Sequence, residues 1–232
     1  MDRAPDASSS LPGAAIELAA AIRAGGMLWC VAPGLDDHAR HLAVEFVHPS
    51  SVGARAVAAV AIPTRMVSEM MQELRVNVHA GDVIVSMGDA DTAFDDGVGL
   101  RAQAWGAVHL HLGWSTRTAS RPNTRFVGVG PGARSERLLT RAYHLLWELT
   151  FVCLGRPGTQ ASGGDDDSCA VWSDEAVVGE IIEVDRDRIA VRTACGTIQV
   201  DVTLVPPVRV HDLVLVHAGM ALRTLDVDDG AQ

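Results

Sequence analysis

Two pairs of residues have the types and spacing of metal ligands. His41 and Glu45 are four positions apart, and Glu136 and His144 are eight apart. Four helical residues make just over one turn and eight just over two, so each pair returns to one face of its helix. Imidazole nitrogens and carboxylate oxygens bind Zn²⁺, Fe or Ni. A His and a Glu at this spacing are also common surface neighbours, and Glu136 also suits the start of a helix.

A thiol and another imidazole lie in the C-terminal third of the chain. Cys169 follows residues 156–168, which are rich in Gly, Ser and Asp, so we expect an accessible thiol that binds soft metals as the thiolate. His217 ends an apolar run in which Leu213, Leu215 and His217 point to one side of a strand. The alternatives are a surface thiol without a role and a core histidine satisfied by the backbone.

Composition excludes several classes of function. The net charge of −10 argues against nucleic acid, whose recognition needs a basic face. All 19 basic residues are Arg, which excludes a lysine Schiff base and a P-loop lysine. The four cysteines are widely spaced without a CxxC pair, which disfavours a zinc ribbon. The apolar runs are shorter than the ~18 residues of a membrane span, and the N-terminus lacks the features of a signal peptide, so we expect a cytoplasmic protein that does not bind membranes.

The elements that must position these residues alternate between strand and helix. Short strands that are apolar on both faces, alternating with helices, predict a doubly wound α/β domain with a parallel sheet over residues 1–155. The ligand site of such a sheet lies at the carboxyl ends of its strands. The expected helices are 11–23, 36–46, 64–75, 97–105 and 134–154, and the expected strands are 27–32, 56–62, 83–87, 108–113 and 126–130.

The rest of the chain predicts a second, smaller domain. Residues 156–168 hold too little apolar surface to order themselves and predict a flexible linker. Residues 169–232 contain several short alternating strands, at 177–184, 189–192 and 197–202, before an apolar strand that ends at His217. This number of strands in so short a segment predicts a small OB-like β-barrel.

Two segments of the first domain resemble the loops of sugar-isomerase (SIS) domains of the phosphoheptose-isomerase type. They are VAPGLDDHARHLAVEF, Val31–Phe46, and GDVIVSMGDADTA, Gly81–Ala93. In that family hydroxyl groups and backbone amides of these loops hold a sugar phosphate. Here Leu35, Asp89 and Asp91 stand at or beside the hydroxyl positions. Leucine offers no hydrogen bond and carboxylates repel phosphate, so we expect phosphosugar binding to be weakened or lost.

The same resemblance assigns roles to the four spaced residues. His41 matches a metal ligand, and Glu45 matches a metal ligand or an acid/base. Glu136 stands where the family has a Gln, and His144 matches the family's histidine on the last helix. The resemblance therefore implies a site for Zn or another divalent transition metal, and a homo-oligomer, a dimer or a tetramer. In an isomerase, Glu45 and His144 would be the catalytic acid and base.

Two segments of the second domain resemble the HupF/HypC-type chaperones of NiFe-hydrogenase maturation. Asp212–Leu222, DLVLVHAGMAL, follows that family's closing segment, with His211 where a Gly is usual, and Ala176–Val184, AVVGEIIEV, resembles its first strand. A cysteine just before that strand ligates an Fe(CN)₂CO unit in the family. Cys169 lies five positions earlier than a strict alignment would place it. The resemblance implies that Cys169 binds this iron precursor and that His217 acts as a second ligand or a base.

Three functions follow as hypotheses. The first is an accessory protein of hydrogenase maturation, whose partner is the hydrogenase large subunit or a maturation scaffold protein. The second is a metal-dependent sugar-phosphate isomerase of the sedoheptulose 7-phosphate type. The third is a sugar-phosphate-binding protein without catalysis.

Overall fold

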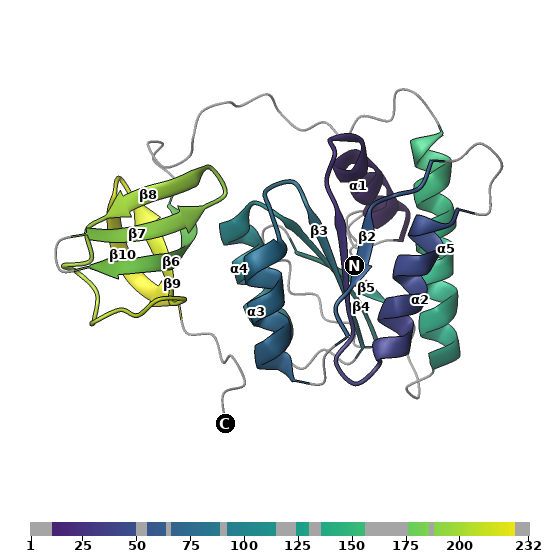
Figure 1. Cartoon of the computed structure of the whole chain (residues 1–232), viewed down its shortest axis with the longest axis horizontal. Coiled ribbons are helices and arrows are strands. Elements are labelled where there is room, and N and C mark those ends of the chain that lie inside the picture. The colour runs from purple at the N-terminus through teal and green to yellow at the C-terminus, as the bar shows by residue number, and fades with distance from the viewer. Residues whose placement is uncertain are drawn as a thin grey trace, which may run out of the picture.

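Two five-stranded sheets form the framework of the protein, one before and one after residues 156–175. Figure 1 shows the sheets beside each other, with the helices gathered around the first. The architecture is the predicted one, a doubly wound α/β unit with a parallel sheet followed by a small barrel-like β unit. The predicted linker lies outside the described residues. The computed structural model describes residues 11–49, 55–63, 66–88, 92–114, 124–129, 136–155, 176–185 and 188–225.

The first sheet is parallel, in the order β2-β1-β3-β4-β5. The first strand of the sheet is β1. The next, β2, lies on one side of β1, and β3 lies on its other side, so the strand order reverses next to β1. Ligands bind beyond the carboxyl ends of the strands at such a reversal. The strands are β1 (Leu28–Val31), β2 (Ala59–Ala61), β3 (Val83–Gly88), β4 (Val108–Gly113) and β5 (Thr124–Gly128).

Helices cover both faces of this sheet. α1, α2 and α5 pack in one hydrophobic cluster, and α3 and α4 pack in another. β3 is buried along its whole length because Val83 and Val85 face the first cluster and Ile84 faces the second. No helix among the described residues is long and apolar enough to cross a membrane. The helices are α1 (Leu11–Arg23), α2 (Asp36–Val47), α3 (Val67–Asn77), α4 (Thr92–Trp105) and α5 (Glu136–Leu154).

A polar cluster is buried between β3, β4 and α4. The Ser86 hydroxyl lies 2.8 Å from His109 Nε2 and 2.8 Å from His111 Nδ1. Burial, and then the nearby His111, lowers the pKa of His109 to about 3, so His109 is neutral in the folded protein. A Cβ atom at Gly99 would lie 2.6 Å from Thr124 Oγ1, so α4 can approach the sheet here only through a glycine. Both histidine side chains are almost completely buried in β4.

The second sheet is antiparallel, in the order β10-β9-β6-β7-β8. Its two ends meet at Asp201, whose N–H donates to the Gly219 carbonyl at 3.0 Å and whose carbonyl accepts from Ala221 N–H at 2.8 Å. A Cβ atom at Gly179 would lie 2.3 Å from Val191 Cγ1, so the strands cross tightly there. The strands are β6 (Val177–Asp185), β7 (Arg188–Thr193), β8 (Gly196–Val200), β9 (Leu213–His217) and β10 (Met220–Leu225).

One outer face of the barrel packs against α3 and α4. Leu213 of β9 lies in the same buried cluster as Trp105 of α4. Arg192 of β7 donates to the carbonyl oxygens of Arg75 and Val78, at 3.2 and 2.6 Å. These carbonyls lie at the C-terminal end of α3, where the helix dipole favours a cation. The two sheets therefore share a hydrophobic core and a polar contact.

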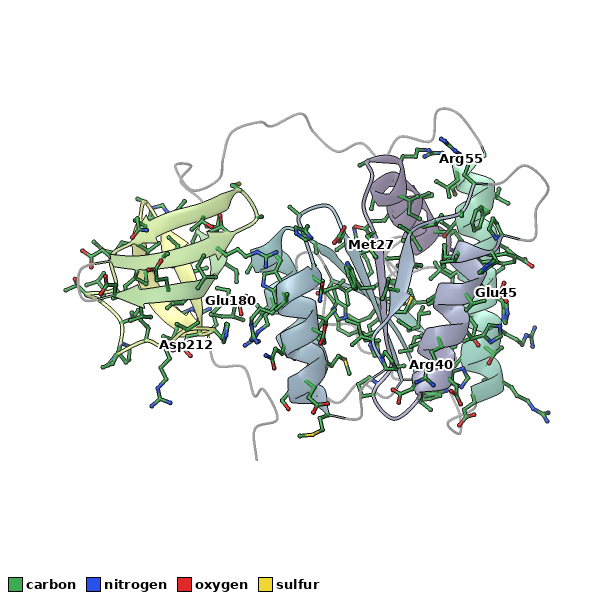
Figure 2. The ribbon with its side chains drawn as sticks, in the orientation of Figure 1. Met27, Arg40, Glu45, Arg55, Glu180 and Asp212 are labelled. Carbon is green, nitrogen blue, oxygen red and sulfur yellow. The ribbon has the colours of Figure 1, made fainter. Side chains whose placement is uncertain are left out.

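Glu180 of β6 is the centre of this contact and is fully buried. Its carboxylate lies 2.5 Å from Arg75 Nε, 2.5 Å from Trp105 Nε1 and 3.8 Å from Arg101 Nε. His211 Nδ1 lies 3.5 Å away on the barrel side. Figure 2 labels Glu180 at the junction of the barrel with the helices. A buried carboxylate is tolerated when cations and donors surround it in this way, and separating the two units would expose or orphan all of them.

Candidate metal site

Three of the four residues predicted as metal ligands lie together on α2 and α5. The possible ligand atoms of His41, Glu45 and His144 are all within 4.8 Å of one another. His41 Nε2 lies 3.0 Å from Glu45 Oε1, and His144 Nε2 lies 3.5 Å from the same oxygen. The site is partly open, since 45% of the His41 side chain is exposed and 33% of His144. Figure 2 shows Glu45 beside α5, on the side of the molecule away from the barrel.

Backbone contacts hold two of these residues in place. His144 Nδ1 lies 2.8 Å from the Thr140 carbonyl. Since a carbonyl can only accept, Nδ1 carries the proton, and Nε2 presents its lone pair toward Glu45 when the ring is neutral. Trp147 Nε1 donates to the Glu45 carbonyl at 2.8 Å, which joins α5 to α2 at the level of the site.

Tyr143, the single tyrosine of the chain, contacts the His41 ring nitrogen that does not face Glu45. The side chain is almost completely buried, and its hydroxyl lies 3.1 Å from His41 Nδ1 and 3.4 Å from His38 Nδ1. Burial raises the pKa of Tyr143, the hydrogen bond with Thr140 lowers it, and the charge of Glu45 raises it, so the direction overall is upward. The phenol is therefore neutral at physiological pH, and its oxygen can accept a hydrogen bond from His41 Nδ1–H while His41 Nε2 faces the ligand position.

The donor set fits a divalent transition metal. Two imidazoles and one carboxylate are a set that zinc uses when it keeps a position open for water or substrate. Both imidazoles can carry their proton on Nδ1, because each Nδ1 has an oxygen partner. The two Nε2 atoms then offer their lone pairs beside the Glu45 carboxylate. A hydrogen-bond partner on the remote ring nitrogen is the usual support of a metal-bound histidine.

Glu136, the fourth predicted ligand, lies apart from this group. Its carboxylate is 3.6 Å from His38 Nε2, and 70% of the side chain is exposed. It begins α5, where a carboxylate suits the helix dipole. The structure thus extends a chain of polar contacts from the predicted site, through Tyr143 and His38, to Glu136 at the solvent.

Of the two residues predicted to bind iron, the structure describes His217. Cys169 lies outside the described residues. His217 is the last residue of β9 and is half-buried. Ala218 and Gly219 then form the turn to β10 with φ of 49° and 77°, a left-handed conformation that glycine adopts without strain. His217 is therefore fixed at one end of the barrel.

The sequence did not indicate two sets of contacts, those of Tyr143 and His38 beside the candidate site and those of Glu180 between the barrel and the helices. Tyr143 and His38 reach the site only because α2 packs on α5, and their positions are about a hundred residues apart. Glu180 is an acidic residue in an alternating strand, and such residues usually face solvent. An acidic residue among apolar neighbours was the one sign in the sequence that Glu180 is buried. Its partners Arg75 and Trp105 lie in helices that are remote in the sequence, so this sign could not identify them.

Comparisons with known proteins define the two parts separately. The N-terminal part shares its fold with SIS-domain proteins. A phosphoheptose isomerase from Francisella tularensis matches with a TM-score of 0.51 and 11% identity, over 63% of this chain and 85% of that chain. A phosphoheptose isomerase from Neisseria gonorrhoeae matches with a TM-score of 0.45 and 18% identity, over 62% and 84%.

The C-terminal part has a family of its own. Residues 176–232, which include all five strands of the barrel, match the HupF/HypC family. A search of curated proteins found no match. The chain therefore joins a segment that matches the HupF/HypC family to an α/β unit that shares the fold of a phosphoheptose isomerase, as the two resemblances predict.

Proposed function

We propose that this protein is a cytoplasmic accessory factor of NiFe-hydrogenase maturation. Its barrel carries or docks the Fe(CN)₂CO precursor of the iron centre, or binds the hydrogenase large subunit or a maturation scaffold protein. The match of residues 176–232 to the HupF/HypC family carries this proposal, because this range contains all five strands of the barrel. The α/β unit serves as the platform on which the barrel is docked.

The strand register supports a joint role for Cys169 and His217. β6 and β9 are antiparallel, and Val177 at the start of β6 pairs with Val216 next to His217. The chain thus enters the barrel at the end where His217 lies. Cys169 precedes Ala176 by seven residues, a span of at most about 25 Å, so the thiolate can reach that end. A thiolate and an imidazole are ligands that iron accepts.

Complementation of hydrogenase activity tests this proposal. A hydrogenase-producing host that lacks this protein receives the wild type, Cys169→Ala or Cys195→Ala. Cys195 is the matched control, since it is an exposed cysteine in the β7–β8 turn of the same barrel. We expect only Cys169→Ala to leave the large subunit without iron. Full activity in the Cys169→Ala strain would refute the iron-carrier form, and full activity without the protein would refute the function altogether.

A second candidate is metal-dependent sugar-phosphate chemistry in the α/β unit. The cluster of His41, Glu45 and His144 favours it, together with the shared fold. A bound Zn²⁺ would supply a Lewis acid, and Glu45 and His144, where they do not ligate it, would move protons at the substrate's carbonyl. The two side chains lie 3.5 Å apart, close enough to act on one substrate. Asp89 and Asp91, which depart from the family's phosphate loop, lie outside the described residues.

Metal content and turnover separate this candidate from the first. Elemental analysis of untagged protein compares the wild type with His41→Ala/His144→Ala, and we expect stoichiometric zinc or nickel only in the wild type. Turnover of sedoheptulose 7-phosphate that Glu45→Gln abolishes would establish an isomerase. A rise of the melting temperature with this sugar but no turnover would indicate a sugar-phosphate-binding protein. Sedimentation of the same samples reports whether the protein is a dimer or a tetramer.

A further inference from the structure

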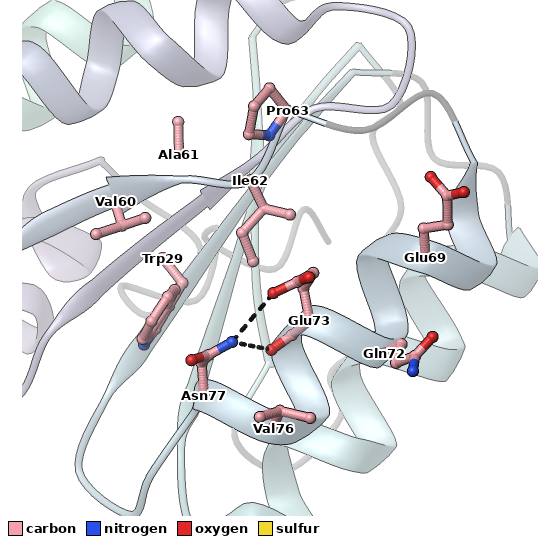
Figure 3. Close-up of a pocket in the computed structure, with 10 residues that line it drawn as sticks. All are labelled: Trp29, Val60, Ala61, Ile62, Pro63, Glu69, Gln72, Glu73, Val76 and Asn77. Atoms are coloured by element: carbon pink, nitrogen blue, oxygen red, sulfur yellow. Dashed lines mark hydrogen bonds between the residues drawn. The ribbon is translucent and has the colours of Figure 1, made fainter.

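A groove of about 720 Å³ runs between the edge strand β2 and helix α3. Figure 3 shows its two sides. Residues of β1, β2 and the segment after β2 form the floor, and one face of α3 forms the wall, since its groove residues recur every three or four positions. The floor contains Trp29, Val60, Ala61, Ile62 and Pro63, and the wall contains Glu69, Gln72, Glu73, Val76 and Asn77.

The backbone of β2 offers an edge on which another strand can pair. Ile62 N–H donates to Cys30, and the Ala58 carbonyl accepts from Leu28, so alternate residues of this segment face β1. The N–H and C=O groups of Ala59 and Ala61 point the other way. Among the described residues, β2 ends the order of the sheet and has no strand on that side. An unpaired edge of this kind is a template for an added strand.

The side chains around the groove combine exposed apolar surface with negative charge. Val60 is 38% exposed and Val76 is 72% exposed, one on each side of the groove. Two carboxylates, Glu69 and Glu73, line the wall, and the described lining residues include no basic side chain. The Glu73 carboxylate accepts a hydrogen bond from the neutral amide of Asn77, at 3.2 Å, as Figure 3 shows. The groove therefore complements a cation with an apolar stem.

We propose that this groove is the docking site for an extended, basic segment of a partner protein, which adds to β2 as a further strand. Alternate side chains of an added strand face the groove. An Arg or Lys there lays its methylene stem over Val60 and Ile62 and brings its charge to Glu69 and Glu73. The intervening residues face the α2 side of the sheet, where Ala59 and Ala61 pack, and are apolar. The proposal goes beyond the proposed function and does not depend on it.

A second copy of this chain is a poorer occupant. Pairing two β2 edges around a twofold axis perpendicular to the sheet keeps α3 on the same face in both copies. The wall residues Glu69 and Glu73 would then face their own counterparts, and like charges placed opposite each other are repulsive. The chain as a whole carries a net charge of −10, which also favours a basic partner.

The test uses a fluorescein-labelled peptide of three Val-Arg repeats and the full-length protein. We expect fluorescence anisotropy to show saturable binding that Glu69→Gln/Glu73→Gln weakens about fivefold, the value for two partly exposed ion pairs. Glu148→Gln/Glu183→Gln is the matched control, since it removes the same charge from exposed positions of α5 and β6. Because strand pairing needs the peptide's own amides, N-methylation of one alternate set of residues should abolish binding, and methylation of the other set should not.

Three results would overturn the proposal. The first is no binding of the Val-Arg peptide at millimolar concentration. The second is equal weakening by both pairs of substitutions, which would mean general attraction to an acidic protein. The third is a dimer in analytical ultracentrifugation that Val60→Arg dissociates, which would assign the groove to a second copy.

Discussion

Replacing Glu180 by alanine should destabilise the whole protein, because the change leaves several buried partners without a counter-charge. Arg75 is 15% exposed and Arg101 is 2% exposed, so water cannot replace the lost carboxylate. Trp105 Nε1 loses its acceptor at the same time. Removing one member of a buried ion pair costs about 3–5 kcal/mol, a large part of the roughly 5–15 kcal/mol by which such proteins are stable.

Urea unfolding followed by tryptophan fluorescence and far-UV circular dichroism measures this loss. Glu180→Gln keeps the size of the side chain and an acceptor for Trp105, so its cost should be smaller, about 1.5–3 kcal/mol. Glu183→Ala, on an exposed position of the same strand, should stay within about 0.5 kcal/mol of the wild type. We also expect Glu180→Ala to split the single transition into two, since the barrel and the α/β unit would no longer unfold together. A single transition with a loss below about 1 kcal/mol would refute the role assigned to Glu180.

Three further predictions concern single side chains. Tyr143→Phe should lower zinc affinity about 10- to 100-fold in competition with a chromophoric chelator, because His41 loses its oxygen partner, and unchanged affinity would contradict the positioning role. His109 has a pKa of about 3 in the folded protein and an ordinary value of 6.5 when unfolded. The unfolded state alone therefore gains a proton as the pH falls below 6.5, and stability should drop by about 2 kcal/mol between pH 7 and pH 5. Urea titrations at both pH values should show a smaller drop for His109→Gln, and an identical drop would contradict the assignment. Burial raises the pKa of the Cys30 thiol, so iodoacetamide should label exposed Cys195 but not Cys30 in the native protein, and a native adduct on Cys30 by peptide mass mapping would contradict this.

Much of the fold follows from local patterns. Val83, Ile84 and Val85 place apolar side chains on both faces of a strand, which favours a strand covered on both sides, and the structure buries it completely. The strand ending at His217 is similar, because Leu213 packs toward the helices while Val214 packs inside the barrel. The beginning of α4 at Thr92, five residues before its expected start, was missed because its first turns carry two aspartates and a glycine, which are poor helix formers.

The site was predictable only where one helix carries it. His41 and Glu45 share a face of α2 by spacing alone, and the structure brings their side chains within 3.0 Å. The match of His144 to them needed the family resemblance, because sequence spacing says nothing about which helices pack together. The same spacing argument places Glu136 on the face of His144, yet two turns of α5 carry it toward His38 instead. Contacts between remote elements, such as those of Glu180, depend on packing that no local pattern records.

The contact between the barrel and α3 and α4 has a consequence for how the two halves can be separated. A face built from Leu213, Arg192 and the Glu180 cluster should recognise its counterpart without a peptide bond between them. Two co-expressed fragments, 1–155 and 170–232, should then purify as a complex. In the intact chain the two units are covalently joined, which gives them a high effective concentration for each other, of the order of millimolar. A free HupF/HypC barrel present in the same cell would therefore compete poorly for this face, and the fusion remains paired with its own barrel.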